Sequence, residues 1–133
     1  MSVSASVRRI VRERAGDACE YCLLSQDADE MPLQIEHIQA QQHGGCDDPD
    51  NLALACGTCN RRKGPNLTGV DAFTGEIVRL FHPRRDAWRE HFAWDGLTIV
   101  GLTDVGRVTV QVLAMNSREQ VETRRHVDIA RDA

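Results

Sequence analysis

The chain has 133 residues, of which 41% are hydrophobic and only 5% aromatic, and its formal net charge is −4. This length is typical of one compact domain or of a small domain with an extension. No apolar run approaches the ~20 residues of a membrane span, and residues 1–16 contain no apolar signal core. We therefore expect a cytoplasmic protein with no membrane partner, whose binding to any nucleic acid would depend on local arginine clusters.

The first half of the chain predicts two helices with two strands between them. Residues 4–15 carry an apolar stripe between a serine cap and Gly16, the pattern of an amphipathic helix. Residues 33–38 alternate apolar and polar side chains, as half-buried strands do. The predicted elements are a helix over 4–15, a strand over 33–38, turns over 43–51, a strand over 52–55 and a helix over 58–63 that ends at Gly64-Pro65.

The second half predicts a mixture of strands and helices. Pro83 suits the first turn of a helix, where a missing N–H has no cost. Residues 103–115 fit both an alternating strand pattern and a helical one, and we favour a helix capped by Thr103. The predicted elements are a turn and strand over 71–81, a helix over 82–92, a strand over 97–102, a helix over 103–115 and a helix over 117–130.

Four of the five cysteines form two CxxC pairs, Cys19 with Cys22 and Cys56 with Cys59. Two such turns can supply the four thiolates of a structural zinc site, with iron as the main alternative metal. Disulfides or buried free thiols are the other interpretations. An odd cysteine count in a chain expected to be cytosolic argues against a disulfide framework. The fifth, Cys46, lies among turn formers and is expected to take no part in the site.

The segment between the two pairs carries the polar residues that could perform chemistry. Glu36 and His37 interrupt the apolar pattern of their strand, which is more common at a functional site than in a core. A neutral imidazole can accept a proton from water near pH 7, and carboxylate or amide oxygens can hold a divalent cation. The alternative is that His37 simply faces solvent. Adjacent strand residues point to opposite faces, so the pair can converge on one phosphate only where the strand bends or ends.

Taken together, CEYC, IEHI, HGG and DNLALACGTCNRRKG resemble the HNH endonuclease family in the order and spacing of their motifs. The resemblance covers about residues 17–66, and the segments LFHPRRDAWREHF and VQVLAMN resemble the extension of small stand-alone bacterial members. It implies an α+β fold: a ββα-metal unit stapled by a four-cysteine zinc site, with an N-terminal helix and a mixed strand and helix C-terminal extension. We expect residues 1–66 to form this core and residues 67–133 to pack on it.

The resemblance also implies roles for individual residues. His37 corresponds to the general base that activates water, and Asn51 to the central asparagine that braces the loop. Asn60 falls where many members carry the final histidine, so this is an H-N-N variant. Glu36 and Asn60 would then hold the catalytic ion, and such oxygen ligands favour Mg²⁺ or Mn²⁺ over zinc. The implied function is metal-dependent hydrolysis of DNA phosphodiester bonds in a bacterial or phage-type cytoplasm.

Arginine clusters are expected to offset the acidic background. Arg61, Arg62 and Lys63 follow Asn60 directly and are predicted to bind substrate phosphates, with His43 as a further candidate. Two other clusters, at residues 8–14 and at 84–85, could equally be solvated surface charge. A non-catalytic, zinc-ribbon-like module that binds nucleic acid or protein is the alternative function.

Overall fold

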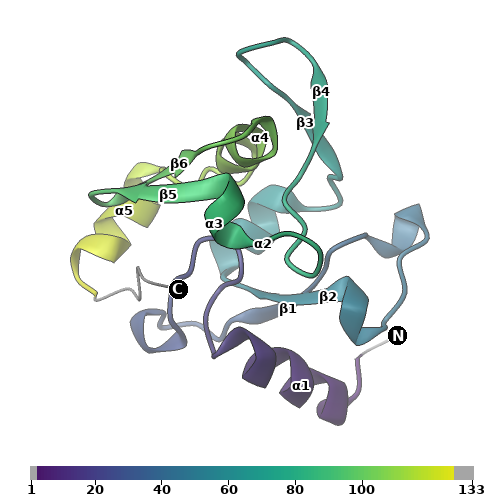
Figure 1. The fold of residues 1–133 in the computed structure, drawn as a ribbon. Coiled ribbons are helices and arrows are strands. Elements are labelled where there is room, and N and C mark those ends of the chain that lie inside the picture. The colour runs from purple at the N-terminus through teal and green to yellow at the C-terminus, as the bar shows by residue number, and fades with distance from the viewer. Residues whose placement is uncertain (1–2, 128–133) are drawn as a thin grey trace.

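A computed structural model of the chain describes residues 3–127 (Figure 1). Short helices and three two-stranded antiparallel sheets follow one another along it. The α-helices and strands are α1 (Ala5–Ala15), β1 (Gln34–His37), β2 (Leu52–Ala55), α2 (Gly57–Lys63), β3 (Thr68–Val70), β4 (Ile77–Arg79), α3 (Trp88–His91), β5 (Phe92–Asp95), β6 (Thr98–Gly101), α4 (Asp104–Val112) and α5 (Arg118–Arg125). No helix of the described residues is long and apolar enough to cross a membrane.

Helix α1 forms where the sequence predicts it. The hydroxyl of Ser4 accepts a hydrogen bond from the Val7 amide at 3.3 Å, which satisfies one of the free donors of the first turn. Gly16 ends the helix with φ of 63°, a left-handed conformation that costs glycine little. Val11, on the apolar side of the helix, is fully buried and attaches α1 to the core.

The two strands and helix that follow form the predicted ββα unit. Strand β1 pairs with β2 in antiparallel register, with Glu36 opposite Ala53 and His37 opposite Leu52. All four residues of β2 are buried, so this strand fixes the hairpin in the core between α1 and the elements that follow (Figure 1). Helix α2 begins beyond Cys56, whose sulfur accepts a hydrogen bond from the Cys59 amide at 3.4 Å. The α+β class and the ββα arrangement are as predicted.

The prediction of a helix over residues 82–92 is wrong. Asp86 accepts hydrogen bonds from the backbone amide of His82 and from the guanidinium of Arg79, which holds residues 82–86 in a turn. Only Trp88–His91 is helical. Phe92 then starts strand β5, where it is buried and pairs with Gly101 of β6. The pairing of this strand with β6 takes Phe92 out of the predicted helix.

The helix predicted over 103–115 is confirmed as α4, with the Thr103 hydroxyl capping it through the Gly106 amide at 3.0 Å. The helix predicted over 117–130 is α5, and residues 128–130 lie outside the described range. The β3–β4 hairpin projects away from the rest of the protein (Figure 1). One face of it packs on α4, where a side chain at Gly69 would collide with Val108 and Val112.

A single apolar core joins the two halves of the chain. The ring of Phe81 meets Tyr21 edge to face with centroids 6.4 Å apart, and the Trp88 indole donates to the Tyr21 carbonyl at 2.8 Å. The ion pair between the largely buried side chains of Arg84 and Glu20 adds a third link. Arg84 is thus a structural residue and is not free to bind a ligand. The division into a core at 1–66 and an extension at 67–133 stays a prediction.

Candidate active site and metal centre

Two tight turns bring four cysteine sulfurs together in the core. The sulfurs of Cys19, Cys22, Cys56 and Cys59 all lie within 4.8 Å of one another, and each residue is at most 2% exposed. The Sγ atoms of Cys22 and Cys56 are 3.7 Å apart. Tetrahedral zinc with bonds of ~2.3 Å separates its sulfurs by roughly 3.8 Å. Cys46 is exposed and lies outside the cluster, as expected.

The chemistry of this cluster fits a cation. Burial raises the pKa of the Cys19 thiol well above its ordinary value, because charged sulfur is poorly solvated in the core. Hydrogen bonds from the other cysteines, Cys19 first, lower the pKa of Cys56. Four thiolates cannot coexist at this spacing without a compensating charge, which a divalent ion supplies. The four-cysteine cluster therefore has the geometry and the donor set of a structural zinc site.

A glutamine from the far end of the chain covers the cluster. The Nε2 atom of Gln120, on α5, lies 3.9 Å from the sulfur of Cys22, 3.8 Å from that of Cys56 and 3.9 Å from that of Cys59. Gln120 is only 4% exposed. An N–H group at this distance stabilises thiolate sulfur and orients the ligands. No signal in the sequence predicts this contact, because one polar residue in a helix is ordinarily a surface residue.

His37 lies at the end of β1, where its side chain is 25% exposed and points to an acid from the following loop. Its Nε2 atom lies 2.7 Å from Oδ1 of Asp47. The hydrogen bond with His37 lowers the pKa of the Asp47 carboxyl, so Asp47 is ionised and acts as the acceptor. Sequence reasoning missed Asp47, because nothing distinguishes it from Asp48 and Asp50 in the same turn-rich stretch.

Asn51 holds the loop that carries Asp47. Its Oδ1 accepts from the Gln39 amide at 2.9 Å, and its Nδ2 donates to the carbonyls of Gln39 at 3.0 Å and Cys46 at 2.8 Å. These three bonds join the two ends of the loop between β1 and β2. The geometry is that of a bracing residue, the role that the resemblance implies for this position.

Glu36 points away from His37, into the interior. Its Oε2 accepts the hydroxyl proton of Tyr21 at 2.7 Å, and its Oε1 lies 2.6 Å from Nζ of Lys63. Both Glu36 and Lys63 are at most 4% exposed. Burial raises the pKa of Glu36, although the charge of Lys63 acts in the opposite direction. Both carboxylate oxygens are therefore engaged within the protein.

Asn60 lies on α2, beside the same hollow as Glu36 and His37. This hollow has a volume of about 470 Å³. The amide Nδ2 of Asn60 donates to the side chain of Gln34, a bond that does not use its Oδ1. The structure thus brings His37 and Asn60 together at one hollow, whereas the carboxylate of Glu36, which also borders it, is turned to the interior.

The motifs at these positions match a known family. The family model for HNH endonuclease matches residues 19–66. These residues form an HNH domain. Searches of curated proteins and of solved structures found no match. The HNH match covers both cysteine pairs, the β1–β2 hairpin and α2, and it ends just after the Gly64-Pro65 stop.

The predicted phosphate-binding residues of the HNH domain do not all lie at the hollow beside His37. Lys63 differs from its prediction: its ammonium is buried and donates to the carbonyls of Ile38 at 2.8 Å and His37 at 3.3 Å, so it is not exposed to a phosphate. Arg62 is exposed. Arg61 lines a separate hollow on the side of the cysteine cluster. His43 is exposed and does not line the hollow at His37.

The pairing of Lys63 with Glu36 predicts a large loss of stability when the cation is removed. Lys63→Met should lower the free energy of unfolding by about 3 kcal/mol at neutral pH, because it leaves a buried carboxylate without its cation. Urea unfolding followed by circular dichroism measures this. Because the pKa of Glu36 is already raised, the loss should shrink as the pH falls below that pKa and the carboxyl takes up a proton.

Arg62→Met removes an exposed charge one position away and is the matched control. It should change stability by less than about 0.5 kcal/mol. In the Lys63→Met background, Glu36→Gln should restore part of the loss. If Lys63→Met and Arg62→Met had equal free energies of unfolding, the ion pair between Lys63 and Glu36 would not stabilise this part of the HNH domain.

Proposed function

We propose that the chain is an endonuclease that hydrolyses phosphodiester bonds of DNA, with His37 as the general base. The observation that carries this proposal is the fixed position of His37 at an open hollow. Its ring is partly exposed, is oriented by Asp47 at 2.7 Å and lies beside Asn60. The contact with Asp47 holds the ring in one orientation, as a positioned general base requires.

The contact with Asp47 identifies the nitrogen that would act as the base. An ionised carboxylate can only accept a hydrogen bond, so Nε2 of His37 carries the proton that it shares with Asp47. Neutral imidazole has one protonated nitrogen, and Nδ1 is therefore the free acceptor. Nδ1 would take a proton from the attacking water, and Asp47 would stabilise the imidazolium that forms.

A divalent ion would neutralise charge on the phosphate and on the leaving 3′ oxygen. The proposed ligands Glu36 and Asn60 are oxygen donors that suit Mg²⁺ or Mn²⁺ and border the same hollow. The fit is incomplete, however, because Lys63 and Tyr21 already engage Glu36. Among the described residues, the cysteines form the only group of three or more ligating Cys, His, Asp or Glu side chains. We therefore assign no step of the mechanism to the ion.

Incubation of the protein with supercoiled plasmid tests the proposal. Nicked or linear DNA should appear with Mg²⁺ or Mn²⁺, and a labelled RNA in parallel reactions would show whether DNA is the preferred substrate. Intact supercoiled DNA under all metal and salt conditions, with a correctly folded protein that still binds DNA, would instead identify a non-catalytic zinc module.

Asn60→Ala separates the catalytic ion from the structural one. It should abolish Mg²⁺-dependent nicking, because it removes the amide oxygen that is not engaged within the protein. The zinc content should stay at one ion per chain by atomic absorption, since Asn60 is not one of the four clustered cysteines. Asn66→Ala, at an exposed asparagine beyond the helix, is the control. Loss of zinc from the Asn60 variant would show a structural role instead.

A further inference from the structure

The hollow at His37 adjoins a second one on the side of α1. The second hollow has a volume of about 540 Å³ and shares three wall residues with the first, Ile35, His37 and Asn60. The proposed general base thus lies on the boundary between the two hollows. We name these two adjoining hollows together the His37 groove.

Two arginines from α1 line the far end of the His37 groove. Arg8 and Arg12 are four positions apart and therefore share one face of the helix. Each guanidinium donates to one backbone carbonyl, Arg8 to Val3 at 3.2 Å and Arg12 to Leu33 at 3.0 Å. Neither forms an ion pair with a carboxylate of the described residues. With five N–H donors apiece, both keep donors for a ligand.

The charge of the His37 groove differs from that of the whole chain. The chain carries a net charge of −4, yet Glu36 is the only acid among the described residues that line the groove, and Lys63 neutralises it. The α1 end is lined by two arginines and by no acid of the described residues. A polyanion is therefore attracted to this groove although the protein as a whole repels it.

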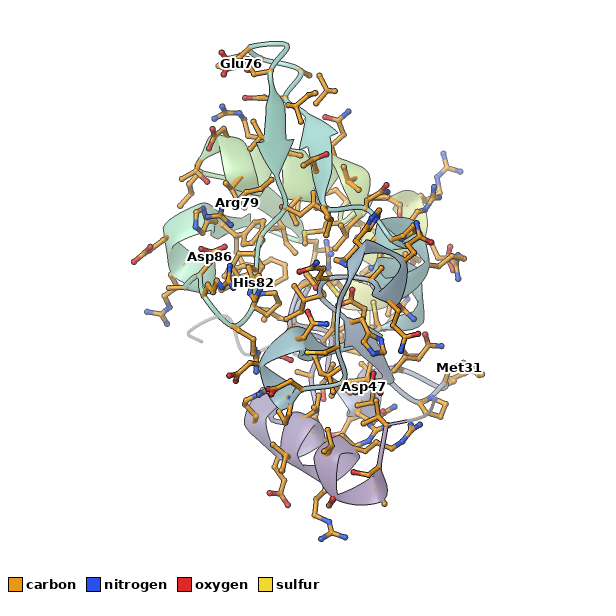
Figure 2. All side chains as sticks on the ribbon, turned by 90° about the vertical axis from the view of Figure 1, so that its right-hand side faces the viewer. Met31, Asp47, Glu76, Arg79, His82 and Asp86 are labelled. Carbon is orange, nitrogen blue, oxygen red and sulfur yellow. The ribbon has the colours of Figure 1, made fainter. Side chains whose placement is uncertain are left out.

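Another cleft of the described residues has a mixed charge. It has a volume of about 690 Å³ and lies between the loop that joins β1 to β2 and residues 79–86. Three acids line it, Asp48, Asp50 and Asp86, together with three basic residues, Lys63, Arg79 and Arg85. Asp86 binds the guanidinium of Arg79. Figure 2 shows Arg79, His82 and Asp86 gathered together, away from Met31, which lines the His37 groove. The three acids make this cleft a weaker candidate for binding a polyanion than the His37 groove, whose single acid is paired with Lys63.

We propose that the DNA backbone lies along the His37 groove and that Arg8 and Arg12 bind phosphates beside the scissile bond. This inference rests on the proposed nuclease function, and it adds a phosphate-binding site supplied by the N-terminal helix. The helix would then do more than cover the hairpin: it would fix the direction in which the DNA backbone crosses His37. The guanidinium groups suit this role because they bind phosphate oxygens in a bidentate fork.

Fluorescence anisotropy of a short labelled DNA duplex tests the site without any need for cleavage. The measurement uses the full chain with His37→Ala, so that the probe stays intact. Adding Arg8→Gln and Arg12→Gln together should weaken binding on the order of tenfold at low salt and make the salt dependence shallower by roughly two units of slope. The control pair Arg118→Gln and Arg125→Gln removes the same charge from exposed positions of α5.

The outcomes separate this site from the nuclease proposal. Arginine-dependent binding by a protein that never nicks plasmid would leave the phosphate site standing and reject the nuclease function. Equal losses of affinity in the two pairs would overturn the site, because the effect would then be one of net charge alone. No detectable binding by any of the folded proteins would overturn it as well. Thermal unfolding of each variant verifies that the fold is intact.

Discussion

Loss of the structural metal is expected to unfold the protein. Structural zinc contributes on the order of 10 kcal/mol, which is comparable with the whole stability of a typical domain, about 5–15 kcal/mol. The four sulfurs join the segment before β1 to the start of α2, so their release frees both ends of the hairpin. Either a strong chelator or Cys56→Ser should therefore abolish the folded circular dichroism spectrum and change the fluorescence of the paired tryptophans, Trp88 and Trp94.

Cys46→Ser is the matched control for this experiment. It removes the one cysteine that lies outside the cluster and is exposed, so stability and zinc content should not change. The two serine variants differ only in whether the lost sulfur belongs to the metal site. Unchanged melting of the Cys56 variant, or of the protein after zinc has been removed, would reject the zinc assignment.

His37→Ala is expected to produce the largest loss of activity. Removal of a positioned general base slows a hydrolysis by roughly 10²–10⁴-fold. Plasmid nicking at saturating metal measures the loss, with a thermal melt to show that the partly exposed position tolerates alanine. His126→Ala is the control, because His126 is an exposed histidine at the end of the far helix. Equal rates in the two histidine variants would remove His37 from the mechanism.

Asp47→Asn refines the same test. The amide keeps the size of the side chain but loses the charge that fixes the Nε2 proton of His37. We expect an activity between those of the wild type and His37→Ala, with unchanged DNA affinity, because Asp47 does not line the groove in which DNA is proposed to bind. A parallel loss of affinity and rate would show that Asp47 only supports the loop.

The features that the sequence predicted correctly depend on short-range patterns. The spacing of each CxxC pair predicts the two cysteine turns. A serine cap and Thr103 place the starts of α1 and α4 within a residue, and Gly16 places the end of α1, whereas α4 ends at Val112, three residues before the predicted end. Strand β2 was predicted over its full length because a short apolar run between turn formers and a knuckle has few alternatives. Each of these features is determined by residues that are close together in the sequence, so a short stretch of sequence is enough to predict it.

What the sequence did not show depends on partners distant in the chain. Glu36 looked available for a metal, but Lys63 and Tyr21 bind it from 27 residues later and 15 residues earlier. The contact between His37 and Asp47 crosses a loop whose acids are alike in composition. The turn at 82–86 depends on Asp86 binding Arg79 of the preceding strand. In each case the folded structure determines which charged side chains pair, and the local sequence pattern does not indicate the pairing.

The cover that Gln120 places over the cysteine cluster has a consequence for how the protein is made. Cys59, the last cysteine of the cluster, precedes Gln120 by 61 positions and so leaves the ribosome well before it. The sulfurs can therefore take up their ion while the cluster is still open, and α5 closes over a site that is already filled. In the folded protein the cysteines are at most 2% exposed and Gln120 lies over three of them, so α5 restricts access to the site. Exchange of a bound ion is therefore expected to depend on how firmly α5 is docked.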